Sequence, residues 1–453
     1  MLRSLALLVL FSPLAFLATG TPSAPAQGPA AKATAKDEPK KGIDRTGATR
    51  KRLLKDFGGS EEGEEAVMLG LAWLTQVQKA DGGWVYDGGR ARDTAPATGM
   101  AVLAFLGAGQ SHKEGRYKQT VQAGLDWLIK DLETSQSPRS GHFKGAFDMY
   151  GQGIATLALC EAYAMTQDAD LREPAQRALD YIQKGQGVNG SWGYQAPGTG
   201  DTSIVGWQVQ ALHAGQLAGL NVDDKVIKKA VAFLEQVSPG QTKSSYGYDN
   251  SGRAAPGTSL TAIGLLCRYY IDGWRRHNAA FVEGTKGLMK RAPKPDQSGK
   301  FPIDVDLYYY YYATQVVRFL GGDEWKDWNE GVKELDGTRK GGMPDWLISI
   351  QNRTRADRGS WNPPRDQWIG PNCGRLEPRA SVCSRSRCTT ATRPRATRTA
   401  PRSSRPHSVP KRSHVSTRRV PALRHRSGSG HALALGAGRG SGAGCAQGRR
   451  KEG

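Results

Sequence analysis

Acidic residues stand directly before two apolar helical segments, and their side chains are suited to proton transfer. Asp201 precedes "TSIVGWQVQALHAG", while Asp304 and Asp306 precede "LYYYYYATQ". A carboxyl group can act as a general acid or base, and paired carboxyl groups across a groove can cleave glycosidic bonds. We therefore take Asp201, Asp304 and Asp306 as catalytic candidates. The alternative is N-capping, because Asp and Thr are favoured immediately before a helix.

Aromatic residues accompany these carboxylates. Five consecutive tyrosines, Tyr308 to Tyr312, follow Asp306, and further aromatic residues lie in neighbouring loops and helices, including Tyr194. Consecutive residues of a helix face all sides, so only part of this run can line one cavity. Aromatic walls suit apolar ligands, cations and the faces of sugars. The candidate ligand-binding residues are Tyr150, Trp207, Tyr308, Tyr309, Trp192 and Trp84.

The elements that must position these residues recur along the chain. An aromatic residue or Met stands in an amphipathic run at Trp73, Trp127, Tyr181, Phe233, Met289 and Trp346, at steps of 54, 54, 52, 56 and 57 residues. A fixed period of this size is typical of a repeat architecture. In five units a second, more apolar helical run follows after a loop rich in Gly, Pro, Asn and Asp. Each repeat is therefore predicted to be a helical hairpin with an outer and an inner helix.

A longer motif joins the outer helix to the loop after it. "WLTQVQKADGGW" begins at Trp73, "YIQKGQGVNGSW" begins at Tyr181, and a third copy runs from Trp346 to Trp361. We expect the Gln near the helix C-terminus to bond free backbone groups and the Trp to cover it. This motif resembles the repeat of the squalene cyclase, terpene cyclase and protein prenyltransferase superfamily. The resemblance implies an all-α fold, an (α/α)6 toroid, over residues 61–375.

The resemblance also implies where chemistry would lie, and the sequence departs from it there. Cyclases of the squalene–hopene kind carry an Asp-x-Asp-Asp motif, of which only the last Asp is matched, by Asp201, with Gly198 and Gly200 at the other two. The zinc-binding Asp-x-Cys of prenyltransferase β subunits is matched by Asp304, but Asp306 replaces the thiolate that zinc prefers. We therefore expect no metal and no cofactor, and enzymatic activity stays an open question.

The net charge of +21 does not indicate a nucleic-acid partner, because residues 376–453 carry +16 of it. That segment lacks Phe, Trp, Tyr, Ile and Met, so it is predicted to be a disordered, Arg-rich tail. The change of composition falls within the sixth repeat, where the last inner helix should begin. A reading-frame shift in a GC-rich gene would produce this pattern and leave the last hairpin incomplete. The alternative is a basic arm for nucleic acid or an anionic surface.

The N-terminus indicates export. Arg3 precedes an apolar run from Leu5 to Leu17 that is too short to span a membrane, and small residues follow it. Residues 1–26 are predicted to be a signal peptide and residues 27–60 a flexible leader, so the mature protein is expected to be periplasmic or extracellular without a membrane span. Cys160 and Cys267 lie within apolar helical runs and are expected to fill the core.

These observations predict an exported toroid that binds or transforms an apolar, isoprenoid-like ligand or a polymeric ligand in a central cavity. The alternatives are a non-catalytic repeat scaffold or binding protein, and a carbohydrate-active toroid. A deep aromatic cavity with converging carboxylates would favour an enzyme. A filled centre would favour a scaffold.

Overall fold

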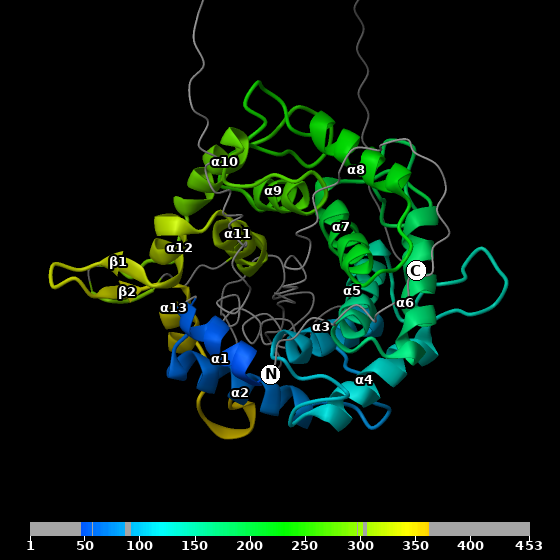
Figure 1. The fold of residues 1–453 in the computed structure, drawn as a ribbon, viewed down its shortest axis with the longest axis horizontal. Coiled ribbons are helices and arrows are strands. Elements are labelled where there is room, and N and C mark those ends of the chain that lie inside the picture. Colours follow the sequence, from blue (N-terminus) through cyan, green and yellow to red (C-terminus); the bar gives the residue numbers. More distant parts are fainter. Residues whose placement is uncertain (1–46, 57, 87–91, 297, 302–305, 362–453) are drawn as a thin grey trace, which may run out of the picture. The chain divides into compact units, whose positions relative to one another are not determined.

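The helices lie in two layers that follow a ring. The computed structural model describes residues 47–56, 58–86, 92–296, 298–301 and 306–361. Figure 1 shows an inner set of helices surrounded by an outer set, and the chain alternates between the two. The prediction of an all-α toroid of helical hairpins is confirmed. The outer helices are α2 (Glu61–Gln76), α4 (Lys118–Asp131), α6 (Ala169–Lys184), α8 (Asp224–Gln236), α10 (Ala279–Met289) and α13 (Met343–Ser349). The inner helices are α3 (Thr94–Gly107), α5 (Met149–Thr166), α7 (Thr202–Leu217), α9 (Ser259–Ile271) and α11 (Leu307–Leu320).

The two layers differ in the width of their apolar surface. In α5 every residue from Gly151 to Ala164 is buried, as expected for a helix that is covered on all sides. In α6 the buried residues are Leu171, Pro174, Ala175, Ala178, Leu179 and Ile182. Their spacing of three and four positions leaves one apolar stripe, so α6 can face the inner layer on one side only. The inner helices pack in chain order, α3 on α5, α5 on α7, α7 on α9 and α9 on α11.

Two helices and a β-hairpin were not predicted. Helix α1 (Gly47–Asp56) lies within the segment predicted as a flexible leader, and the Arg50 side chain pairs with Glu64 and bonds the Ala108 carbonyl oxygen. Helix α12 (Gly322–Asn329) and a hairpin of β1 (Gly331–Lys333) and β2 (Arg339–Gly341) are inserted before α13. The strands pair antiparallel, with Val332 opposite Lys340. A single 3-10 turn, Arg355–Asp357, follows α13.

Several predictions fall on residues outside the described ranges. They are the signal peptide 1–26, most of the leader 27–60, the end of the toroid segment after residue 361, and the Arg-rich tail 376–453. Cys160 and Cys267 are described, and both are buried free thiols, as expected of core residues. Burial raises the pKa of both thiols. Among the described helices, none is both long and apolar enough to cross a bilayer.

The Gln-Gly-Trp motif ties each of its outer helices to the next. The Gln186 side-chain amide donates to Gly190 O at 3.0 Å in its own loop and to Val226 O at 2.9 Å in α8. The Trp192 indole N–H donates to Ile182 O of α6 at 2.8 Å. We predicted that the Gln would bond the free carbonyl groups at the end of the outer helix. In the structure the Trp indole N–H bonds such a carbonyl, because the Gln amide already donates to its own loop and to the neighbouring helix.

The third copy of this motif closes the outer layer. Gln351 donates to Ala66 O of α2 at 2.7 Å, and Trp361 donates to Leu347 O of α13 at 2.7 Å. The contact joins residues that are 285 positions apart in the sequence. Helix α13 packs against α2 as a consequence, and the sixth outer helix meets the first.

The motif glycine is required by a close backbone approach. Gly190 has φ +86°, in the left-handed region that favours glycine, and a Cβ there would overlap the carbonyl oxygen of Lys229 in α8. Gly359 has φ +90°, and a Cβ would overlap Leu69 O of α2 in the same way. The loops therefore approach the next outer helix as closely as backbones can.

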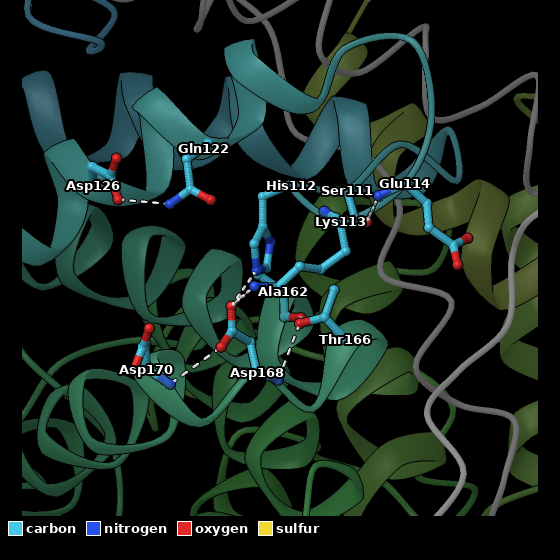
Figure 2. Close-up of polar contacts among 10 residues, drawn as sticks. All are labelled: Ser111, His112, Lys113, Glu114, Gln122, Asp126, Ala162, Thr166, Asp168 and Asp170. Atoms are coloured by element: carbon cyan, nitrogen blue, oxygen red, sulfur yellow. Dashed lines mark hydrogen bonds and ion pairs between the residues drawn. The ribbon is translucent and has the colours of Figure 1, made fainter.

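A second contact between repeats lies at the other end of the inner helices. Figure 2 shows His112 and Lys113, from the loop after α3, directed at Asp168, the N-cap residue of α6. The distances to Asp168 Oδ2 are 2.7 Å from His112 Nε2 and 2.6 Å from Lys113 Nζ. The hydrogen bond from Lys113 lowers the pKa of Asp168 to about 2. Because that pKa is below the ordinary 3.8, the ion pair stabilises the fold above pH ~4 and is lost as the pH falls through ~2.

Replacing the motif glycine should cost more than backbone strain alone. Gly190→Ala adds strain and forces α8 away, so we expect a loss of about 3 kcal/mol or more in the free energy of unfolding. Gly252→Ala is the matched control, because Gly252 has φ +78° with nothing within 4 Å of the added Cβ. That variant should lose about 1–2 kcal/mol. Urea unfolding followed by circular dichroism measures both, and equal losses would contradict the close approach.

Neutralising the N-cap of α6 should weaken the contact between repeats without removing the cap. Asp168→Asn keeps a good capping side chain but loses the charge, so we expect a loss of about 1–2 kcal/mol at pH 7. The difference from the parent chain should shrink as the pH falls towards 2, where Asp168 becomes protonated. Asp126→Asn removes an exposed carboxylate that accepts from Gln122 on the same helix, and it should change stability by less than about 0.5 kcal/mol. A pH-independent loss in Asp168→Asn would exclude the ion pair as its cause.

Candidate functional site

The inner helices begin at one end of the ring, and most begin with a capping side chain. Asp148 accepts from Gly151 N, Asp201 accepts from Ser203 N and Ile204 N, and Asp306 accepts from Tyr309 N. The N-capping interpretation is confirmed for these residues. Asp93 makes no side-chain cap and instead accepts from Phe147 N at 3.0 Å, which holds the loop before α5.

The catalytic candidates are not brought together. Asp201 is buried and caps α7 through Oδ1, which also accepts from the Ser203 hydroxyl. Asp306 accepts from Ser259 Oγ at 3.2 Å and pairs with Arg291 at 3.3 Å. Within the described residues no hydrogen bond joins Asp201 to Asp306, and Asp304 lies outside them. The described residues also contain no group of three or more His, Cys, Asp or Glu side chains that could hold a metal ion.

Three exposed aromatic rings lie in loops that precede successive inner helices, and we call them the aromatic rim: Phe147, Tyr194 and Tyr248. Their exposed fractions are 76%, 49% and 44%, which include them among the few large apolar side chains exposed in the described chain. They come from the loops before α5, α7 and α9. The Tyr194 and Tyr248 hydroxyls are 3.3 Å apart.

Backbone hydrogen bonds fix the rim to the helices below it. Met149 N donates to Tyr194 O at 2.9 Å, and Thr202 N donates to Tyr248 O at 2.9 Å. The Tyr194 and Tyr248 loops are therefore each held by the first residue of an inner helix in the preceding repeat. The Phe147 loop is held by Asp93, so the three rim residues come from three successive repeats.

Below the rim lies a set of phenol hydroxyls, which we call the hydroxyl cluster: Tyr150, Tyr308 and Tyr312. The Tyr150 and Tyr308 side chains are half-buried, and Tyr312 is fully buried. The hydroxyl oxygens of Tyr308 and Tyr312 are buried. The Tyr308 hydroxyl lies between those of Tyr150 and Tyr312 and interacts with both.

The hydroxyl cluster is electrically neutral but adjoins a carboxylate. Burial raises the pKa of Tyr150, Tyr308 and Tyr312 well above the ordinary value of a phenol. The Asp201 carboxylate acts in the same direction on Tyr150 and Tyr308. These hydroxyls therefore stay protonated at neutral pH and can both donate and accept.

Two stacked rings lie next to the hydroxyl cluster and contact Tyr312. Trp207 of α7 stacks on Tyr311 of α11 with ring centroids 5.0 Å apart, and it meets the edge of Tyr312 at 6.0 Å. The Tyr311 hydroxyl donates to Gln210 Oε1 at 2.7 Å. A Cβ on Gly206 would come within 3.2 Å of the Tyr312 hydroxyl, so that hydroxyl lies against α7. Side chains of α7 and α11 thus meet one turn below the start of the inner helices.

Other predicted ligand residues lie elsewhere. The Tyr309 hydroxyl donates to Leu288 O of α10, and its ring lies 4.0 Å from the Arg291 guanidinium. Trp84 and Trp192 are buried, and their indole N–H groups are bonded to Leu74 O and Ile182 O. Of the predicted ligand residues, the structure therefore brings together Tyr150, Tyr308 and Trp207. It places Tyr309, Trp84 and Trp192 elsewhere.

Phe147, Tyr248 and Tyr312 were not predicted, although the sequence holds a signal for Tyr248. In the fourth repeat "YGY", residues 246–248, occupies the place of "WGY", residues 192–194, so Tyr248 corresponds to Tyr194. Because Tyr246 stands in the place of the motif Trp, the match between Tyr248 and Tyr194 is not evident from the motif. Phe147 directly precedes the N-cap Asp148 and has no counterpart in the motif.

No protein-family model matches the chain, and no curated protein matches it. Solved structures of helical toroids are similar in fold at low identity. The α-1,6-mannanase of Salegentibacter sp. HEL1_6 matches with a TM-score of 0.49 and 8% identity over 72% of this chain and 98% of its own. Cellobiose 2-epimerase from Spirochaeta thermophila matches with 0.49 and 11% over 76% and 98%. A type II terpene cyclase from Scytonema matches with 0.43 and 12% over 76% and 99%. Similarity at this level identifies neither a substrate nor a reaction.

Proposed function

We propose that this protein binds an extended carbohydrate chain at the aromatic rim. The observation that carries the proposal is the gathering of three exposed aromatic rings, Phe147, Tyr194 and Tyr248, on loops from three successive repeats. Exposed apolar rings grouped in this way are typical of a binding surface. A row of rings offers the flat apolar contact that sugar faces need, and their hydroxyls lie beside it.

The hydroxyl groups favour a carbohydrate over a hydrocarbon. The Tyr194 and Tyr248 hydroxyls bond each other at 3.3 Å, and each can make a further hydrogen bond that a covering hydrocarbon would leave unmade. A sugar hydroxyl can donate to or accept from each of them. The isoprenoid-like ligand predicted from the sequence is therefore the weaker proposal, although the apolar faces of the rim would also contact it.

We propose binding and not a reaction at the rim. Asp201 is the catalytic candidate nearest to the rim, and its Oδ1 already accepts from Ser203 and Ile204. A carboxylate held in this way caps a helix and is poorly placed to take up or release a proton. We also propose that the protein acts after export, where such polymers are found, as the predicted signal peptide would require.

Removing the rim rings should weaken binding to soluble polysaccharides. The double variant Tyr194→Ala/Tyr248→Ala loses two ring contacts, each worth about 0.5–1.5 kcal/mol, so we expect affinity to fall about tenfold. Isothermal titration with a soluble β-glucan, an α-mannan and a xylan measures the effect. Farnesol in the same assay tests the apolar alternative.

The matched control is Leu335→Ala, which removes a fully exposed apolar side chain from the β1–β2 turn, away from the rim. It should bind as the parent chain does. Binding of farnesol with no binding of any glycan would overturn the proposed ligand class. Glycan binding that is unchanged in the double variant would overturn the rim as its site.

A further inference from the structure

The two tyrosines of the aromatic rim form an exposed hydroxyl pair beside a buried carboxylate. The hydrogen bond between the Tyr194 and Tyr248 hydroxyls, at 3.3 Å, is exposed, whereas Asp201 is only 2% exposed. Thr202, the residue after Asp201, donates its N–H to Tyr248 O at 2.9 Å and its hydroxyl to Gly247 O at 2.7 Å. The backbone at Tyr248 is therefore fixed against the residue next to Asp201.

The Asp201 carboxylate sets the direction of the hydrogen bond between the two tyrosines. Ser203, through its N–H and its hydroxyl, and Ile204 N all donate to Oδ1, so the second carboxylate oxygen takes no part in the cap. Burial, the Tyr194 hydroxyl and the Asp201 carboxylate together raise the pKa of Tyr248. Because a carboxylate only accepts, the single proton of the Tyr248 hydroxyl points towards Asp201. The Tyr194 hydroxyl is then the donor in the pair.

With its protons used in this way, the hydroxyl pair offers a ligand only acceptor positions. A phenol hydroxyl has one proton and two lone pairs, so both oxygens of the pair can still accept a hydrogen bond. A ligand group must donate in order to be bonded here. Sugar hydroxyls, amides and ammonium groups can donate, whereas carboxylates and sulfates cannot. The negative charge of Asp201 disfavours the same anionic groups.

We infer that Asp201 determines the specificity of the rim: by orienting the hydroxyls of Tyr248 and Tyr194, it restricts the ligand to carbohydrate chains without carboxylate or sulfate groups. This inference rests on the proposed function and narrows its substrate class to neutral or amino-bearing chains. Asp201 is a positioning residue that acts through Tyr248, and no reaction at it is required. The net charge of +21 would by itself favour acidic chains, so composition predicts the opposite preference.

Two derivatives of one polysaccharide test this preference on the full-length protein. The β-glucan, α-mannan or xylan that binds is converted to its hydroxyethyl and its carboxymethyl form at equal substitution, so that the added groups are similar in size and differ in charge. Titration in about 0.5 M sodium chloride, where the screening length is about 4 Å, suppresses the contribution of distant charges. Binding at the rim is the part that is lost in Tyr194→Ala/Tyr248→Ala.

The parent chain should bind the hydroxyethyl form about tenfold or more tighter than the carboxymethyl form. Equal binding of the two forms at the rim overturns the inference while leaving the proposed function intact. Failure of the parent chain to bind any of the three underivatised polysaccharides overturns the proposed function, and the inference with it.

The variant Asp201→Asn tests the role of the carboxylate. Asn still caps the helix, but its amide donates to the Tyr248 hydroxyl, whose own proton then becomes free for a ligand. The preference for the hydroxyethyl form should fall to about twofold or less. Asp148→Asn is the matched control, because Asp148 caps the neighbouring inner helix next to Phe147, which has no hydroxyl. An unchanged preference in Asp201→Asn, or an equal fall in Asp148→Asn, overturns the inference.

The variant Tyr248→Phe tests the hydroxyl separately and leaves the cap of α7 intact. Without the Tyr248 oxygen, the Tyr194 hydroxyl loses its acceptor, and its proton becomes free to donate to a ligand. Affinity for the hydroxyethyl form should fall only about threefold, because the ring remains, while the preference over the carboxymethyl form should fall as in Asp201→Asn. A full preference retained in Tyr248→Phe means that the carboxylate acts without the hydroxyl pair, and it overturns the inference.

Discussion

The contact on which the rest of the structure depends is the one between a motif loop and the next outer helix. In three repeats the Gln amide joins its own loop to a carbonyl of that helix, at Thr120, Val226 and Ala66. The glycine lets the backbones touch, and the Trp takes up the carbonyl left free by the outer helix. Each contact fixes the position of one hairpin relative to the next. A small displacement of one hairpin is therefore not passed on around the ring.

This arrangement explains why the acidic residues are caps. Inner helices joined through outer ones all run in the same direction, so their free N–H groups gather at one end of the ring. Those groups need acceptors, and Asp148, Asp201 and Asp306 supply them. The carboxylates that the sequence suggested as catalytic therefore serve as helix N-caps. The loops between them carry the exposed rings of Phe147, Tyr194 and Tyr248.

The sequence could predict the fold because its repeats are regular, and it could predict only part of the site. The spacing from Trp73 to Trp346 identified the helical hairpins, whereas α1 and the β1–β2 hairpin have no counterpart in the repeat and were missed. Within the tyrosine run, helix geometry separates Tyr309 from Tyr308 by about 100° and places Tyr312 near Tyr308. That period alone would have selected Tyr308 and Tyr312. Which face of α11 points inward depends on its packing against α7 and α10. That packing cannot be predicted from a local sequence pattern.

The hydroxyl cluster shows how polar groups are accommodated inside the ring of helices. The Tyr308 hydroxyl interacts with those of Tyr150 and Tyr312, so the hydroxyls of α5 and α11 serve as partners for one another. A Phe at position 312 would keep the ring contact with Trp207 but lose this interaction. Ring packing and hydroxyl pairing therefore act together in joining α5, α7 and α11.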